Sequence, residues 1–376
     1  RVPDTRLALG DLARFWRGQF SIPFIGVTGS NGKTTVKEMI AAILRRRGEV
    51  LVTEGNLNND LGVPLTLFRL DERHRYAVIE MGANHLHEIA YLAAIAQPTV
   101  GIVTNAGPAH LEGFGSLDGV ARGKGELFVG LPADATAVIN ADDAFGCGLL
   151  RQLPAAVNAL SYGLAGAAHE QRPALFAEQV ELRPDGLRMR VNSPWGTGDI
   201  TSGLLGRFNA SNLLAVLGAL LVTGMPFERA CVRVQALTTV PGRMERYGGA
   251  GQPLVVVDYA HTPDALQHVL QALREHCGGK LRCVFGCGGD RDRGKRPIMG
   301  RIAEAHADEV VLTDDNPRSE DPDAITREIL AGMQAPQRVR VMHDRASAIT
   351  AAVHASAPGD VVLVAGKGHE AVQIVG

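Results

Sequence analysis

Short apolar runs, each ending in polar residues, alternate with amphipathic stretches along most of the chain. In the first half, such runs predict strands at residues 22–28, 76–80, 99–104 and 136–140, with helices at 34–47 and 117–129. The alternation starts again in the second half, with strands predicted at 254–258, 282–285, 309–313, 338–342 and 361–365. This alternation predicts an α/β fold with parallel sheets, whose ligands bind at the carboxyl ends of the strands.

Three segments depart from that alternation. Residues 1–20 predict a short helix with its apolar side chains on one side, and residues 209–223 predict a buried helix. Residues 158–201 hold short runs separated by Pro, Gly and Asp, which predicts a small antiparallel insertion. We expect a domain boundary just after the turn Pro241-Gly242-Arg243.

Length, charge and composition exclude several classes of protein for this sequence. At about 150 residues per domain, the 376 residues predict two or more domains. A net charge of −2 argues against a protein that coats nucleic acid, which needs a basic surface. The longest apolar run, residues 213–225, is too short to span a bilayer. The five cysteines form no Cys-x-x-Cys pair, which predicts reduced thiols and a cytoplasmic protein.

Residues 26–35, Gly-Val-Thr-Gly-Ser-Asn-Gly-Lys-Thr-Thr, lie between a predicted strand and a predicted helix. Gly29 and Gly32 allow backbone N–H groups to approach phosphate oxygens, next to the positive end of the helix dipole. Lys33 can reach the β- and γ-phosphates, and the Thr34 hydroxyl can bind Mg²⁺. Val27 stands where the strict phosphate-loop pattern has glycine, so the match is to the shorter GxxGKT form. A glycine-rich turn with a solvated lysine is the alternative.

Polar residues also follow the other strands of the first half. Glu80 ends its strand, where it could bind Mg²⁺ or be a surface carboxylate. Asn105 and His110 follow the next strand, where a substrate phosphate or a second metal would lie, although a lone histidine is often structural. Lys124, taken alone, predicts only a lysine on a helix face.

Further candidates stand in the buried helix and in the second half. Asn209 and Asn212 share one helix face, where they could contact a base or cap the helix. Asp258 could bind a ribose hydroxyl, and the arginines of residues 286–296 could clamp a carboxylate. Residues 314–318, Asp-Asp-Asn-Pro-Arg, offer both signs of charge, which suits an amino acid but also a solvated proline turn. Glu370 follows the last strand and could bind an ammonium group.

Together these motifs resemble the Mur ligase family, the ATP-dependent amide ligases of peptidoglycan precursor synthesis. Residues 1 to about 135 most resemble its D-alanyl-D-alanine-adding members (MurF), in segments 4–10, 55–64, 80–84 and 109–116. Residues from about 136 to 376 most resemble its meso-diaminopimelate-adding members (MurE), in segments 257–266, 286–296, 315–318 and 365–370. The resemblance implies a P-loop ATPase central domain with a parallel sheet at 21–242 and a Rossmann-like C-terminal α/β domain at 243–376. Residues 1–20 would be the linker from a UDP-sugar domain that the sequence does not contain.

The resemblance also implies roles for individual residues. Catalysis would involve Lys33, Lys124 and His110, with Lys124 matching the family's carbamylated lysine. The metal ligands would be Thr34, Glu80, His110 and Lys124. The nucleotide would contact Gly29, Asn31, Gly32, Lys33, Thr34, Thr35, Asn209, Arg243 and Asp258. The substrates would contact Asn105, Arg291, Asp315, Asn316, Arg318, Gly366 and Glu370.

The implied activity is the addition of meso-diaminopimelate to UDP-N-acetylmuramoyl-L-alanyl-D-glutamate through an acyl phosphate, with ATP and Mg²⁺. Arg318 favours this acceptor, because lysine-adding relatives lack that arginine. The alternatives are a D-alanyl-D-alanine-adding ligase acting on the UDP-N-acetylmuramoyl-tripeptide, or an ATP-binding fragment or hybrid without ligase activity. A folate-type glutamate ligase shares the architecture, but the turn at 315–318 argues against it. The implied partners are a UDP-N-acetylmuramoyl-peptide and an amino acid or dipeptide, without nucleic acid or a membrane span, and we expect a cytoplasmic monomer.

Overall fold

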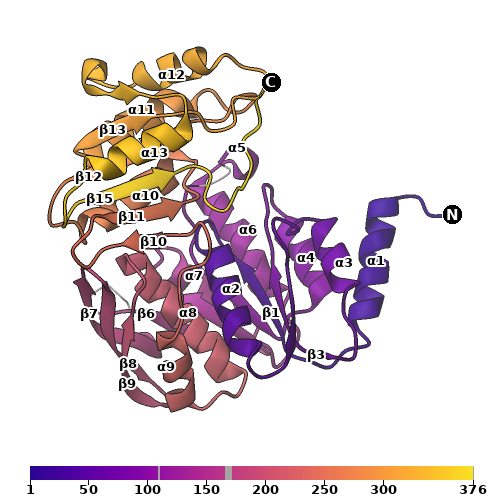
Figure 1. The fold of residues 1–376 in the computed structure, drawn as a ribbon. Coiled ribbons are helices and arrows are strands. Elements are labelled where there is room, and N and C mark those ends of the chain that lie inside the picture. Colours follow the sequence, from indigo (N-terminus) through magenta and orange to yellow (C-terminus); the bar gives the residue numbers. More distant parts are fainter. Residues whose placement is uncertain (109–110, 166–171, 376) are drawn as a thin grey trace. The chain divides into compact units, whose positions relative to one another are not determined.

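The computed structural model describes residues 1–108, 111–165 and 172–375 (Figure 1). The chain packs into two compact units. The first comprises Arg1–Glu181, Arg188–Ser202 and Phe208–Leu237. The second comprises Leu182–Leu187, Gly203–Arg207 and Thr238–Gly376.

A nine-stranded sheet forms the first unit, in the order β2-β3-β1-β4-β5-β6-β7-β8-β9. From β2 to β7, each strand runs parallel to its neighbour, as the alternation of strands and helices predicts. The strands are β1 (Phe24–Thr28), β2 (Glu49–Val52), β3 (His74–Glu80), β4 (Val100–Val103), β5 (Thr136–Asn140), β6 (Asn158–Leu164), β7 (Leu175–Arg183), β8 (Gly186–Ser193) and β9 (Gly196–Ser202).

The segment 158–201 corrects one prediction. Its first two strands are not antiparallel, because β6 pairs in parallel with β5 and β7 pairs in parallel with β6, and β8 and β9 extend the same sheet beyond β7. Its buried side chains, including Leu160 and Leu175, approach Gly218 of helix α8 (Arg207–Val222) together with Val138 of β5. The buried helix α8 therefore packs against β5, β6 and β7 alike, and the three strands belong to one continuous sheet.

Helices cover the parallel strands of the first unit. Helix α2 (Lys33–Leu44) packs against β1, β2 and β3, whereas α4 (Glu88–Ala96) and α6 (Leu117–Val129) pack against each other and against β1. Helix α1 (Thr5–Arg17) lies beside α3 (Gly62–Leu67) and α4 (Figure 1). The remaining helices are α5 (Leu111–Phe114), α7 (Gly146–Arg151) and α9 (Phe227–Gln235).

The buried Arg17 attaches α1 to the sheet layer. Its guanidinium donates to the carbonyl oxygens of Ala96, Gln97 and Phe20 at 2.7, 2.9 and 2.8 Å. The same guanidinium lies 3.8 Å from the centre of the Phe24 ring. Asp4 caps the other end of the helix by accepting from two backbone N–H groups. The predicted helix within residues 1–20 therefore runs from Thr5 to Arg17.

The second unit is a six-stranded sheet in the order β10-β11-β15-β12-β13-β14. Only its edge strand β10 is antiparallel to its neighbour. The strands are β10 (Glu245–Gly248), β11 (Leu254–Asp258), β12 (Leu281–Phe285), β13 (Glu309–Leu312), β14 (Arg340–Val341) and β15 (Val361–Ala365). The helices are α10 (Pro263–Arg274), α11 (Lys295–His306), α12 (Pro322–Leu330) and α13 (Arg345–His354), with a 3-10 turn at Pro336–Arg338.

Each sheet gathers its candidate residues at one edge. In the first unit Val27 of β1 is paired with Glu80 of β3, and Thr28 is paired with Val103 of β4, so these strands end together. In the second unit Asp258 of β11 is paired with Ala365 of β15. Among the described residues, no helix has both the length and the apolar character needed to cross a bilayer.

Candidate active site

The predicted phosphate loop connects β1 to α2 in the structure. Gly29 and Gly32 have positive φ angles of 142° and 82°. A Cβ atom at Gly29 would collide with the Thr104 hydroxyl, and one at Gly32 would lie 2.8 Å from Asn212 Oδ1. Backbone conformation and space therefore both require glycine at these two positions.

Asn105 holds this loop from the end of β4. Its Oδ1 accepts from the Asn31 N–H at 2.9 Å, and its Nδ2 donates to the Asn31 carbonyl at 3.1 Å. Its own carbonyl accepts from the Ser30 N–H at 2.9 Å. The structure therefore shows Asn105 fixing the shape of the loop, a contact that the spacing of residues did not indicate.

Lys33 places its ammonium group inside the loop. Nζ donates to the Gly29 carbonyl at 2.7 Å and to the Ser30 carbonyl at 3.1 Å. Thr34 and Thr35 follow in the first turn of α2, whose N-cap Gly32 has no side chain to cap the backbone N–H groups. A positive charge and the start of a helix thus meet at one point, which is the arrangement that binds phosphate.

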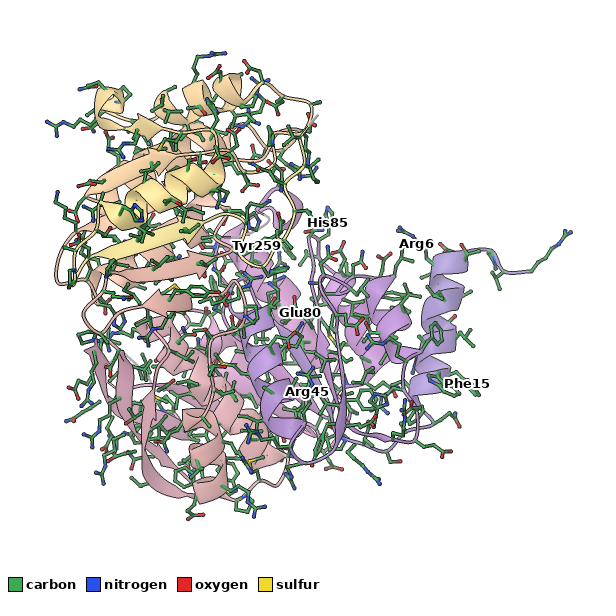
Figure 2. The ribbon with its side chains drawn as sticks, in the orientation of Figure 1. Arg6, Phe15, Arg45, Glu80, His85 and Tyr259 are labelled. Atoms are coloured by element: carbon green, nitrogen blue, oxygen red, sulfur yellow. The ribbon has the colours of Figure 1, made fainter. Side chains whose placement is uncertain are left out.

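Glu80 is a buried carboxylate beside this loop, at the end of β3 (Figure 2). Its Oε1 accepts from Asn58 Nδ2 at 2.9 Å. Its Oε2 is buried and has no hydrogen-bond partner among the described residues. A buried carboxylate oxygen without a donor suits a hard cation, so this oxygen fits the Mg²⁺ that the phosphate loop implies.

Two neighbours of Glu80 were not foreseen from the sequence. Asn58 holds Oε1, and the buried Lys37 lies with Nζ 3.8 Å from Oε2. Lys37 makes shorter contacts of 2.8 Å to the Thr53 carbonyl and to Glu38 Oε1. The one available signal for Lys37 was its position one helical turn after Lys33.

Lys124 is a buried side chain in α6, which its sequence context alone, a lysine on a helix face, did not indicate. Nζ donates to the Ala83 carbonyl at 3.3 Å and lies 5.2 Å from the centre of the Phe114 ring. Burial, followed by the nearby charge of Lys33, lowers the pKa of Lys124 to about 7. A substantial share of its amine is therefore uncharged and nucleophilic near neutral pH.

The other predicted residues of the first unit fall into two groups. Asn209 and Asn212 are buried on α8, where Asn212 Nδ2 donates to Asn209 Oδ1 at 3.0 Å. Asn212 also lies against Gly32, so the start of α8 adjoins the phosphate loop. His110 lies outside the described residues.

In the second unit, Asp258 and Arg243 lie at the end of β11. The buried Asp258 accepts from the N–H groups of Met244 and Ala260, both at 2.8 Å, and burial raises the pKa of its carboxyl. The Arg243 guanidinium lies 4.8 Å from the centre of the Tyr259 ring (Tyr259 is labelled in Figure 2). Stacking of this kind gives Arg243 a defined place beside Asp258.

The predicted amino-acid site is a mixed-charge cluster that joins the ends of β13 and β15. Asn316 Nδ2 donates to Glu370 Oε2 at 3.0 Å, and Lys367 Nζ donates to both Asn316 Oδ1 and Glu370 Oε2 at 2.9 and 3.0 Å. Asn316 Oδ1 also accepts from the Ile374 N–H at 2.9 Å. These contacts occupy the Asn316 amide, so this residue holds the cluster together.

The same end of the second sheet holds four more predicted site residues: Asp315, Gly366, Arg318 and Arg291. A Cβ atom at Gly366 would lie 2.7 Å from Asp315 Oδ2, which brings the two loops into contact. One at Gly288 would lie 2.9 Å from Arg318 Nη1 and 3.7 Å from Arg291 Cγ, so the two arginines flank this glycine.

Two cations of the second unit were missed in the sequence. Lys367 stands inside the motif that ends in Glu370, and Arg345 begins α13. Arg345 donates to the Ala365 carbonyl at 2.7 Å and to the Asp314 carbonyl at 3.3 Å. Lys367 and Arg345 place positive charge beside the acidic turn at residues 314–318. This arrangement suits a ligand that carries both positive and negative charge.

Comparisons with known proteins cover the two parts of the chain that hold these residues. The chain matches the family model of the Mur ligase middle domain over residues 27–220, and that of the Mur ligase, glutamate ligase domain over residues 242–368. It is 43% identical to the UDP-N-acetylmuramoyl-L-alanyl-D-glutamate–2,6-diaminopimelate ligase of Alkalilimnicola ehrlichii, over 100% of this chain and 78% of the relative. It is 42% identical to the ligase of the same name from Chromobacterium violaceum, over 99% and 78%.

Solved structures give the same family. MurF from Acinetobacter baumannii superposes with a TM-score of 0.79 at 30% identity, covering 98% of this chain and 79% of that one. A UDP-N-acetylmuramoyl-L-alanyl-D-glutamate–2,6-diaminopimelate ligase superposes with a TM-score of 0.69 at 32% identity, covering 99% and 79%. MurF from Thermotoga maritima, in complex with ADP, superposes with a TM-score of 0.76 at 25% identity, covering 97% and 81%.

These matches cover both units, and the family resemblance drawn from the motifs is confirmed. The chain belongs to the Mur ligase family of enzymes.

Proposed function

We propose that this enzyme adds meso-diaminopimelate to UDP-N-acetylmuramoyl-L-alanyl-D-glutamate in an ATP-dependent reaction. The observation that carries the proposal is the mixed-charge cluster of Arg318, Asn316, Lys367 and Glu370 at one edge of the second sheet. Such a cluster suits an amino acid with more than one carboxylate and a free amine. Relatives named for this reaction match the chain over its full length, including the part whose motifs resemble MurF.

In the first step of the proposed reaction, an oxygen of the substrate carboxylate attacks the γ-phosphorus of ATP. The bond between that phosphorus and the β,γ-bridging oxygen breaks, which gives ADP and an acyl phosphate. Lys33 and the N–H groups at the start of α2 would hold the phosphates, with Gly29, Asn31, Gly32, Thr34 and Thr35 shaping the loop. Asn209, Arg243 and Asp258 would hold the rest of the nucleotide. The ADP-bound relative supports nucleotide binding.

Magnesium would be held by Thr34, Glu80, His110 and a carbamylated Lys124. When bound, Mg²⁺ supplies charge neutralisation for the phosphate oxygens. Two observations support this assignment. Glu80 Oε2 is buried and accepts no hydrogen bond from the described residues. The pKa of Lys124 is lowered, and a neutral amine can react with CO₂ to give a carbamate.

In the second step, the amine of the acceptor attacks the carbonyl carbon of the acyl phosphate. The amide C–N bond forms, the C–O bond to phosphate breaks, and the amine loses a proton. Asp315, Arg318, Arg291, Gly366 and Glu370 would hold the acceptor in this step, with Asn316 organising the turn. Asn105 would act through the shape of the phosphate loop.

We further propose domains at residues 21–242 and 243–376, with residues 1–20 as a linker, and a cytoplasmic, monomeric enzyme. A D-alanyl-D-alanine-adding activity is the second candidate. Two observations favour it: the MurF-like segments before residue 135, and the superposition on MurF with a TM-score of 0.79.

A panel of acceptors separates the two candidates. With ATP and UDP-N-acetylmuramoyl-L-alanyl-D-glutamate, meso-diaminopimelate should stimulate ADP release far more than L-lysine or D-alanyl-D-alanine. Arg318→Ala should lower kcat/KM for meso-diaminopimelate by about 30- to 100-fold, the effect of losing a charged hydrogen bond. The KM for ATP should stay unchanged. The matched control is Arg327→Ala, an exposed arginine on α12 whose loss should leave both values unchanged.

The proposal fails if D-alanyl-D-alanine, offered with the UDP-N-acetylmuramoyl-tripeptide, is the one acceptor that stimulates ADP release. It also fails if Arg318→Ala and Arg327→Ala behave alike.

A further inference from the structure

Two loops at the acceptor edge each contain a non-glycine residue in the left-handed region. Asp290 in the loop after β12 and Arg318 in the loop after β13 both have φ angles of 52°. This conformation is unfavourable for side chains other than glycine and persists where surrounding contacts impose it. The contacts that impose it therefore control where the Arg318 side chain lies.

The two loops are joined by a short series of hydrogen bonds. The Gly289 N–H donates to the Asn316 carbonyl at 2.9 Å, and Arg318 Nη1 donates to the Gly289 carbonyl at 2.7 Å. The Asp290 carboxylate accepts from the Ser319 hydroxyl at 2.7 Å and from the Ser319 N–H at 3.2 Å. A Cβ atom at Gly289 would collide with the Pro317 carbonyl, so the loops approach as closely as backbones can.

Glu320 fixes the first loop to the second. It lies two residues after Arg318, and its Oε1 accepts from the Asp290 N–H at 2.6 Å. Because this bond reaches the backbone of the left-handed Asp290, it acts directly on the conformation of that residue.

Arg296 in turn fixes Glu320. Its side chain is completely buried, and its guanidinium donates from Nη1 to Glu320 Oε2 and from Nη2 to Glu320 Oε1, both at 2.8 Å. Nη2 also donates to the Gly288 carbonyl at 3.1 Å, in the first loop. Such a bidentate pair with arginine defines the orientation of a carboxylate more strictly than a pair with lysine could.

We propose that Glu320, oriented by Arg296, is a positioning residue that sets the affinity and selectivity for the acceptor amino acid by holding the Asp290 and Arg318 loops in register. This inference rests on the proposed function in taking the Arg318 edge as the acceptor site. It assigns to the arginine that ends the 286–296 motif a protein carboxylate as its partner, in place of a substrate carboxylate.

The Glu320 carboxylate stays ionised, so its pair with Arg296 is present at all physiological pH values. The two bonds from Arg296 hold the pKa of Glu320 at about 2. A carboxyl group whose pKa is lowered stays ionised at every pH above that value, so the pair persists across the physiological range.

The test compares Glu320→Gln with Glu328→Gln. Glu328 on α12 also accepts from Arg296 Nη1, at 2.7 Å, and pairs with Arg293, but the described contacts of its side chain include neither Asp290 nor Arg318. The Glu328→Gln substitution therefore removes an equally close charged hydrogen bond from the same Arg296 guanidinium. For each variant the KM values for acceptor and ATP are measured, together with the ratio of kcat/KM for meso-diaminopimelate to that for L-lysine.

We expect Glu320→Gln to raise the acceptor KM about tenfold and to lower the selectivity ratio by about the same factor, with the KM for ATP unchanged. Glu328→Gln should change each value by less than about twofold. If Glu320→Gln lowers the melting temperature but matches Glu328→Gln in acceptor KM and selectivity, Glu320 is merely structural and the inference is wrong.

A milder variant keeps the test decisive if Glu320→Gln does not fold. Ser319 is exposed, and Ser319→Ala removes one bond to Asp290. It should raise the acceptor KM about threefold, and an unchanged value overturns the inference. If the wild-type enzyme uses another acceptor, the proposed function is wrong, and the same KM comparison with that acceptor still decides the role of Glu320.

Discussion

Lys33→Ala should lower the rate of ADP release by about 10³-fold or more, because it removes the positive charge from the centre of the phosphate loop. The ammonium group donates to the Gly29 carbonyl at 2.7 Å and to the Ser30 carbonyl at 3.1 Å, so its charge lies within the loop itself. Loss of a preorganised charge raises the barrier of the step in which the phosphoryl group moves.

The measurement is ADP release with all substrates saturating, together with calorimetric titration of ATP. Arg45→Ala is the matched control, since Arg45 is an exposed cation at the far end of the same helix (Figure 2). Unchanged ADP release by the Lys33 variant would refute the assignment of the loop.

Lys124→Ala should cause a loss of similar size, about 10²- to 10³-fold, if a carbamate on this lysine supplies a carboxylate to the metal. Small carboxylic acids such as acetate should restore part of the activity, because the alanine leaves space for their carboxylate. Arg122→Ala, an exposed change on the same helix, is the control and should behave as wild type.

The pKa of Lys124 gives this prediction a pH dependence. Since burial lowers the pKa to about 7, the amine is mainly protonated below that pH and mainly neutral above it. Uptake of ¹³C-labelled CO₂ by the lysine, observed by NMR, should therefore rise as the pH passes upward through about 7. A signal that falls as the pH rises over this range, or an acetate-treated variant that stays inactive, would contradict the carbamate.

Most buried parallel strands were predictable because they are read as continuous apolar runs. The partly exposed strands β2 and β10 were not predicted. The failure at residues 158–201 has a physical cause: β7, β8 and β9 expose many side chains, so their mixed pattern resembled a small antiparallel insertion. The strand predicted at 338–342 shortens to β14, Arg340–Val341, because both of its side chains are exposed.

The candidate site was predictable where a motif is continuous in sequence, as in the loop around Lys33. Contacts between distant segments were not, as for Asn58 with Glu80 or Arg296 with Glu320. Lys124 shows why the burial of a side chain was not predictable from the sequence around it. Its burial depends on close packing around Gly123 and Gly125, and a Cβ atom at these positions would collide with Phe114 and approach Leu149. Those two glycines were the one local sign that the lysine faces inward.

In the proposed reaction, a phosphoryl group passes from ATP in the phosphate loop to a substrate carboxylate before the amine attacks. The direct test is the reaction of UDP-N-acetylmuramoyl-L-alanyl-D-glutamate labelled with ¹⁸O in the reacting carboxyl group, followed by mass spectrometry of the released phosphate. An acyl phosphate predicts that each phosphate carries one labelled oxygen for each amide formed. Amide formation with unlabelled phosphate would contradict the account.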